Sequence, residues 1–342
     1  MAIATKISTD MVDDKLRNDF WRALIKPMYE IPLNKDNRDY QFQGTISARR
    51  AGPIQIGATT FNAQDYVRTP QVIAQSGLDH YILQVITGGT LKGDFNGIDV
   101  AAQQGDIVVI DLAQTVASRA DAGSRVTVVI PRDSLERIVG WRNLHGLVMR
   151  ANNPITRLLF DYLRGLQSVS GELNGDEAHS AQEAMLTLLG AGITGSEGGA
   201  LEKLPINLPM RKRILAYIDD NLPNPLLGPH SIIQYFRVSR SHLYRAFVMD
   251  GGVAKVIRDK RLDCAYRILI SQSGKPVSFK EIAYRCGFHN GTQFTKAFKV
   301  RFGMSPKDAR IMGAPLLSSD PDAFSYPIHL TKEAAKVGII KP

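Results

Sequence analysis

One short run, Val277–Phe288, constrains the fold of this chain more than any other feature. Ser278 stands three residues before Glu281, a spacing that is typical of a capping box at the start of a helix. Gly287 then allows a sharp turn, and Asn290 can cap a second helix. Helix, short glycine turn and helix in this order predict a helix-turn-helix unit, with a generic helical hairpin as the alternative.

The second helix of this unit has two clearly different sides. Phe294 and Phe298 are four residues apart, so they lie on one side and are expected to be buried. The other side carries short polar and basic groups that can reach base edges and phosphates. We therefore expect DNA contacts from Asn290, Gly291, Thr292, Gln293, Thr295, Lys296 and Lys299.

A second, weaker copy of this pattern lies upstream. Pro229–Phe236 is expected as a first helix, and Ser239 can cap the next, whose inward side holds Leu243 and Phe247. The residues expected to face DNA here are Ser239, Arg240, Ser241, Tyr244 and Arg245. Between the two units, Ala254–Ser271 contains neither Gly nor Pro and predicts one helix about 27 Å long. Such a rod can hold two recognition helices roughly one DNA turn apart, about 34 Å.

The positive charge of the chain is concentrated in this same region. The net charge is +9, and Met210–Arg310 holds 19 Lys and Arg against 7 Asp and Glu, a balance of +12. The rest of the chain therefore has a balance of −3. Such asymmetry favours a polyanionic partner for that block, with a basic but solvated surface as the alternative.

The N-terminal half has a different texture. Short β-branched runs such as Tyr81–Ile86, Ile107–Ile110 and Arg125–Ile130 are separated by turns rich in Gly, Asp and Asn. This spacing predicts a small β-barrel or sandwich. Helical spacing then begins at Asn153, which can cap a helix that starts with Pro154.

The expected fold is therefore α+β with two domains. We expect an effector-binding and dimerisation domain over 1–189, a Gly- and Ser-rich linker over 190–208, and a DNA-binding domain over 209–312. Residues 313–342 are expected as an irregular tail with a short helix near Thr331–Lys336.

These motifs together resemble the AraC/XylS family of bacterial transcription regulators. The resemblance covers Met210 to Arg310 and rests on Arg261-Leu262-x-x-Ala265, Ile268-Leu269, Ile282-Ala283-x-x-x-Gly287-Phe288 and Phe294-x-x-x-Phe298-x-x-x-Phe302-Gly303-x-Ser305-Pro306. It implies two major-groove helices, with base-facing positions at Ser241, Tyr244, Arg245, Gly291, Thr292 and Lys296. The chain departs from the family pattern at Gly291, where a polar residue is usual, at Arg237, where Gly is usual, and at Ile233, where a small residue is usual.

The N-terminal half is similar to the cupin-like sensing domain of one branch of that family. The similarity rests on Arg68-Thr69, Gly89, the turn Asp94–Asp99, Gly105–Asp111 and Pro131-Arg132-x-x-Leu135. It implies a barrel that binds a small organic effector and trailing helices that form a homodimer. Arg68 could pair with a carboxylate effector or brace a strand. The resemblance assigns one apolar helix stripe to the dimer interface, and a domain core is the alternative. This stripe consists of Ile155, Leu158, Leu159, Tyr162 and Leu166.

Several other classes of protein are disfavoured. No apolar stretch is long enough for a membrane span and no secretory signal is present, so we expect a bacterial cytoplasmic protein. Cys264 and Cys286 lack a metal-binding spacing, and His80 is the only histidine before His145, so neither a metal, a cofactor nor an enzyme is expected. The prediction is an effector-controlled transcription regulator, an activator by the resemblance, that binds double-stranded DNA and RNA polymerase. The alternatives are a cupin-fold enzyme with a DNA-binding appendage and a non-specific DNA-binding protein.

Overall fold

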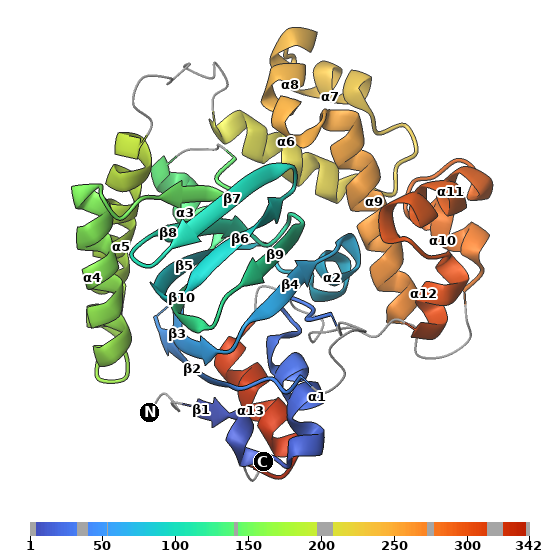
Figure 1. Ribbon diagram of the computed structural model, residues 1–342. Coiled ribbons are helices and arrows are strands. Elements are labelled where there is room, and N and C mark those ends of the chain that lie inside the picture. Colours follow the sequence, from blue (N-terminus) through green and yellow to red (C-terminus); the bar gives the residue numbers. More distant parts are fainter. Residues whose placement is uncertain are drawn as a thin grey trace. The chain divides into compact units, whose positions relative to one another are not determined.

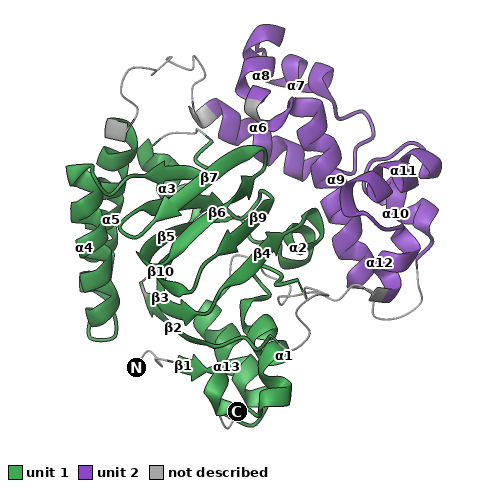
Figure 2. Cartoon of the chain, in the orientation of Figure 1, with its two compact units in different colours: residues 1–198, 317–342 green, residues 199–316 purple. Residues whose placement is uncertain are grey.

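The computed structural model describes residues 5–32, 40–52, 54–139, 143–196, 208–271, 277–312 and 324–339. The chain divides into two compact units (Figure 2). Unit 1 consists of residues 1–198 and 317–342, and unit 2 of residues 199–316. The C-terminal residues therefore belong to the same unit as the N-terminal residues.

Unit 1 is built on two antiparallel sheets (Figure 1). The larger has the strand order β1-β2-β3-β10-β5-β8-β11 and the smaller the order β4-β9-β6-β7. The strands are β1 Thr5–Ser8, β2 Gly44–Ala51, β3 Ile54–Phe61, β4 Gln64–Arg68, β5 His80–Gly88, β6 Thr90–Phe95, β7 Ile98–Gln103, β8 Ile107–Asp111, β9 Val116–Ala120, β10 Gly123–Pro131 and β11 Leu147–Met149. Within the described residues, the expected barrel takes the form of two sheets that do not close.

The central strands of the larger sheet are apolar throughout because both of their faces are buried. In β5, Ile82 and Ile86 belong to the core shared with the smaller sheet, whereas Leu83 and Val85 belong to a second core on the opposite face. That opposite face is covered by α3 Arg132–Val139, α4 Pro154–Val169 and α5 Gly175–Ser196. Side chains alternate between the faces of a strand, so a sheet covered on both sides needs a continuous apolar run.

Part of the expected linker is helical. Helix α5 extends to Ser196, and Ile193 within it is completely buried. A Cβ at Gly190 would lie 2.7 Å from the Ile138 side chain, and one at Gly192 would lie 2.2 Å from Met149. These glycines allow close helix packing rather than flexibility, so the expectation of a linker from residue 190 is wrong at its start. Residues 197–207 of the expected linker lie outside the described residues.

The C-terminal segment contains more regular structure than expected. Helix α13, Tyr326–Lys336, includes the short helix expected near Thr331 but begins earlier. Tyr326, Leu330 and Ala334 recur every four residues and are buried, which gives the helix one apolar face. This face belongs to the same core as α1, Asp14–Ile25, and β1, so the tail completes unit 1. Residues 313–323 of the expected tail lie outside the described residues.

The regular secondary structure of unit 2 is helical throughout its described residues. Its α-helices are α6 Leu208–Asp220, α7 Pro229–Phe236, α8 Arg240–Ala246, α9 Val253–Ile270, α10 Phe279–Arg285, α11 Gly291–Phe302 and α12 Pro306–Met312. Helix α9 is the expected rod and has 18 residues. One pair of short helices precedes it and another follows it, as the two predicted units require.

Candidate nucleic-acid interface and ligand cavity

The second helix-turn-helix unit consists of α10 and α11. The Ser278 side chain caps α10 by accepting a hydrogen bond from the Glu281 N–H at 3.1 Å. The other half of the expected capping box is replaced, because the Glu281 carboxylate accepts from Arg285 Nη2 at 2.6 Å. Gly287 has φ +79°, and a Cβ there would lie 2.3 Å from the Leu222 carbonyl oxygen. Both conformation and space therefore require glycine at this turn.

Helix α11 has a buried side and an exposed side. The Asn290 side chain caps it through the Thr292 N–H at 2.8 Å, and Phe294 and Phe298 are completely buried. Among the predicted DNA contacts, Gly291 is half-buried, and the exposed ones are Asn290, Thr292, Gln293, Thr295, Lys296 and Lys299. Within the described residues, no ion pair engages Lys296 or Lys299. The exposed side of α11 thus offers two cations and several short polar groups to a polyanion.

The first helix-turn-helix unit consists of α7 and α8. Arg237 ends α7 in the left-handed conformation, with φ 52°, where the family pattern has glycine. Ser239 caps α8 through the His242 N–H at 3.2 Å, and the inward Leu243 is buried. The predicted DNA contacts of this unit are all exposed, namely Ser239, Arg240, Ser241, Tyr244 and Arg245, and His242 on the same helix is exposed as well. The fold of the first unit therefore matches the second despite the arginine in its turn.

Some of the basic residues of unit 2 hold the fold together. Arg261 on α9 donates to the backbone oxygens of Leu222 and Asn224 at 3.1 and 2.6 Å. Arg301 on α11 pairs with Asp263 on α9 at 2.8 Å. Burial would lower the pKa of Arg301, but the carboxylate of Asp263 more than compensates and raises it. These arginines are committed to internal contacts, so the surface charge available to DNA is smaller than the sequence count indicates.

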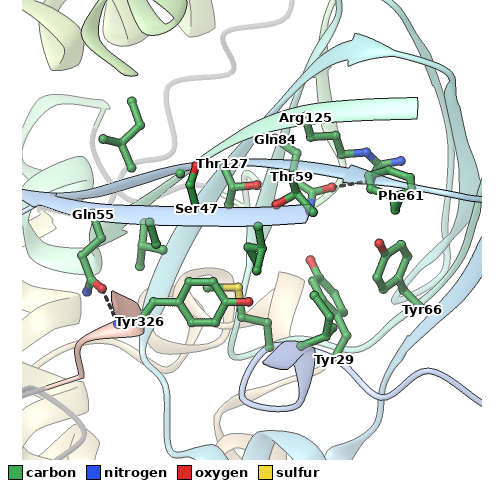
Figure 3. Close-up of a pocket in the computed structure, with 17 residues that line it drawn as sticks. Tyr29, Ser47, Gln55, Thr59, Phe61, Tyr66, Gln84, Arg125, Thr127 and Tyr326 are labelled. Atoms are coloured by element: carbon green, nitrogen blue, oxygen red, sulfur yellow. Dashed lines mark hydrogen bonds between the residues drawn. The ribbon is translucent and has the colours of Figure 1, made fainter. Parts of the chain in front are cut away.

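Unit 1 contains a cavity between the larger sheet and the elements that cover it (Figure 3). The cavity volume is about 50 Å³, which is several times the roughly 10–15 Å³ that one water molecule needs. The cavity is lined by Ile25, Met28, Tyr29, Ile46, Ser47, Ala48, Gln55, Ile56, Gly57, Thr59, Phe61, Tyr66, Gln84, Arg125, Thr127, Val129 and Tyr326. Largely apolar walls with a few convergent polar groups are typical of a small-molecule site.

Among the described residues that line the cavity, Arg125 is the single charged one. Its side chain is buried, with Nη1 donating to Gln84 Oε1 at 2.9 Å and Nη2 to the Thr90 oxygen at 3.3 Å. Burial lowers the pKa of Arg125. Arg125 is not among the effector-binding residues predicted from the sequence. The available signal was an arginine at the start of an otherwise apolar strand.

Arg68 lies elsewhere and has a structural role. It is completely buried and donates to the backbone oxygens of Leu112, Pro27 and Met28 at 2.8, 3.2 and 2.6 Å, and to Ser76 Oγ at 3.0 Å. Burial lowers its pKa to about 10. Arg68 does not line the cavity, so this geometry favours the strand-bracing alternative over an effector contact.

The stripe on α4 that was expected to form a dimer is divided between two environments. Leu159 and Leu166 are buried in the core beneath the larger sheet, and the Tyr162 hydroxyl donates to the Ala181 oxygen at 2.8 Å. Ile155 is half-buried, whereas Leu158 is 59% exposed. Of the five residues, Leu158 is thus the one that presents a largely exposed side chain.

The described residues contain no cluster of three His, Cys, Asp or Glu side chains suited to a metal ion. His80 is buried, with its ring 6.2 Å from that of Phe324. Cys264 and Cys286 are free thiols. None of the helices in the described part of the chain is long and apolar enough to cross a bilayer.

Comparison with known proteins agrees with this architecture. The model of the AraC-binding-like domain matches residues 28–192, and the model of a helix-turn-helix domain matches residues 232–311. The transcriptional activator NphR of Rhodococcus sp is 23% identical over 84% of this chain and 86% of its own length. The uncharacterized regulator YpdC of Escherichia coli K12 is 31% identical over 29% of this chain and 35% of its own length.

The crystal structure of the AraC-like activator CuxR has the same fold. It superposes with a TM-score of 0.53 at 20% identity, covering 76% of this chain and 94% of that one. Three observations support the family assignment: the order of the two matched domains, the similarity to NphR along most of the chain, and the paired helix-turn-helix units. The chain belongs to the AraC family and is a DNA-binding transcription regulator with an AraC-binding-like N-terminal domain.

Proposed function

We propose that the chain is a cytoplasmic, effector-responsive transcription activator whose cavity in unit 1 is the effector site. One observation carries the proposal: a cavity with buried polar groups and the two helix-turn-helix units occur in the same polypeptide. The related NphR is named as a transcriptional activator, which supports activation and RNA polymerase as a partner. In this proposal unit 1 senses a ligand and does not catalyse a reaction.

In this proposal α8 and α11 read two successive segments of the major groove. Arg245 and Lys296 are exposed on the two reader helices, opposite the buried Leu243 and Phe294. Arginine and lysine can donate to guanine edges or to phosphates, and these two roles have different signatures. Loss of a base contact relaxes specificity at one position, whereas loss of a phosphate contact weakens binding to every sequence.

The test is selection of bound sequences from random DNA with the full chain, followed by affinity measurements at two salt concentrations. Arg245→Ala and Lys296→Ala should each weaken binding to the selected operator by about 5–100-fold. Lys92→Ala, which removes an exposed cation from β6 in unit 1, is the matched control and should leave affinity unchanged. A ratio of operator to random-DNA affinity near one would contradict sequence-specific regulation.

The link between effector and DNA is proposed to include α13. This helix follows unit 2 in the sequence, and its first residue, Tyr326, lines the cavity. The Tyr326 N–H donates to Gln55 Oε1 at 2.6 Å, and its hydroxyl donates to the Leu24 oxygen at 3.1 Å. A ligand that favours one docking state of α13 would shift the population of DNA-competent molecules by its difference in affinity for the two states.

The proposed active form is a homodimer that uses the outer face of α4. Leu158 supplies an exposed apolar side chain there. Exposed apolar groups on an otherwise polar helix face are candidates for an interface between copies. A two-fold pair would also place two DNA-binding units on one promoter, and operators with two half-sites would be expected.

A further inference from the structure

We propose that the cavity of unit 1 binds a small organic monocarboxylate whose carboxylate group pairs with Arg125. The inference rests on the proposed effector role of this cavity and names the class of ligand. It starts from the charge balance inside the cavity. The described residues that line it include one arginine and neither Asp nor Glu.

Arg125 is 96% buried, and no carboxylate of the described residues forms an ion pair with it. The neutral oxygens of Gln84 and Thr90 accept from its two terminal nitrogens, and the Phe61 ring lies 5.0 Å from its guanidinium carbon. A buried charge is costly unless it is paired, and neutral acceptors satisfy hydrogen bonds without cancelling charge. An anionic ligand would supply the missing counter-charge.

Two donors in the cavity have no acceptor within the described residues. They are the Nε–H of Arg125 and the hydroxyl of Tyr29. Burial raises the pKa of Tyr29, so its hydroxyl stays protonated and can donate. Figure 3 shows the hydroxyl groups of Tyr29 and Tyr66 directed toward the strand that carries Arg125. A carboxylate has acceptor sites only, and its two oxygens match the fork of a guanidinium.

The remaining walls determine the body of the ligand. The apolar and aromatic side chains of the described residues that line the cavity are Ile25, Met28, Tyr29, Ile46, Ala48, Ile56, Phe61, Tyr66, Val129 and Tyr326. The Tyr29 and Tyr66 rings lie 5.4 Å apart, and Phe61 meets Tyr66 edge to face. The cavity volume of about 50 Å³ is below the roughly 150 Å³ of a cavity that holds benzene, so the site accepts only a compact body, and a ring enters only if lining side chains shift.

The test is calorimetric titration of the full-length protein with three carboxylates and their neutral amides: benzoate, phenylacetate and hexanoate against benzamide, phenylacetamide and hexanamide. Arg125→Gln is compared with Arg119→Gln, which removes an exposed arginine of β9. At least one carboxylate should bind wild type about 10-fold or more tightly than its amide, because hydrogen bonds to charged groups are worth about 1.5–3 kcal/mol. Arg125→Gln should lose that preference, and Arg119→Gln should keep it.

The proposal is overturned if the amides bind wild type as tightly as the carboxylates, or if no carboxylate binds at millimolar concentration. Undiminished carboxylate binding by Arg125→Gln also overturns it. If Arg125→Gln does not fold, the comparison of carboxylate with amide on wild type still decides.

Operator affinity measured with and without each ligand separates this proposal from the broader one. Carboxylates that bind through Arg125 without changing operator affinity would leave the ligand class standing and refute the effector role. If neutral ligands changed operator affinity instead, the effector role would stand and the carboxylate class of ligand would be refuted.

Discussion

Replacing Arg237 by glycine should stabilise unit 2. Arg237 ends α7 with φ 52° and ψ 39°, one of two non-glycine residues with positive φ in the described chain. The left-handed conformation costs an L-residue about 1–2 kcal/mol because its Cβ approaches the following carbonyl oxygen. The Arg237 side chain is exposed and forms no hydrogen bond or ion pair within the described residues, so its removal costs few stabilising contacts.

Glycine also gains entropy in the unfolded chain, which offsets part of this relief by about 0.4–1 kcal/mol. The net stabilisation expected for Arg237→Gly is therefore about 0.5–1 kcal/mol. For a unit of the size of residues 199–316, this corresponds to a rise in Tm of about 2–6 °C.

Thermal unfolding can be followed by far-UV circular dichroism and by tryptophan fluorescence on the full chain. Both tryptophans, Trp21 and Trp141, lie outside residues 199–316 in the sequence, so a loss of ellipticity without a fluorescence change reports unit 2. Arg237→Ala is the matched control, because it removes the same charge and keeps a Cβ in the left-handed conformation. If Arg237→Gly were no more stable than Arg237→Ala, the strain assigned to this turn would be refuted.

Three further predictions concern other parts of the molecule. Gly287→Ala should lower the stability of unit 2 by about 2 kcal/mol or more in the same assay, because φ is +79° and the new Cβ would meet the Leu222 oxygen at 2.3 Å; an unchanged midpoint would contradict this. Leu158→Asp should convert a dimer to monomers in sedimentation velocity without lowering Tm, since this side chain is 59% exposed; a persistent dimer would exclude the α4 interface. Burial raises the pKa of Asp111, but the Arg132 guanidinium lowers this pKa by a larger amount, so the pKa lies below its usual range. Ionised Asp111 should therefore stabilise the fold above about pH 4, and this contribution to the free energy of unfolding should be lost as the pH falls through the folded pKa. In acid titrations followed by tryptophan fluorescence, Asp111→Asn should remove this pH dependence of stability.

The helical half of the fold could be predicted in detail because its signals are local. Ser239, Ser278 and Asn290 cap the helices that the sequence predicted, and Phe294 and Phe298 are buried as their spacing required. Cap, turn and periodicity all act within a few residues of one another. The glycines near residue 190 were misread because their packing partners, such as Ile138 and Met149, are distant in the sequence.

The candidate ligand site could not be predicted because it depends on which buried donors find acceptors. Arg68 and Arg125 are both buried arginines on strands of unit 1, and neither forms an ion pair within the described residues. Arg68 is supplied with backbone carbonyls by Pro27, Met28 and Leu112, about 40 residues away in either direction. Arg125 keeps one donor without an acceptor and faces a cavity. Whether such an arginine braces the fold or binds a ligand is therefore decided by the distant loops that surround each guanidinium. The periodicity of residues within one strand does not contain this information.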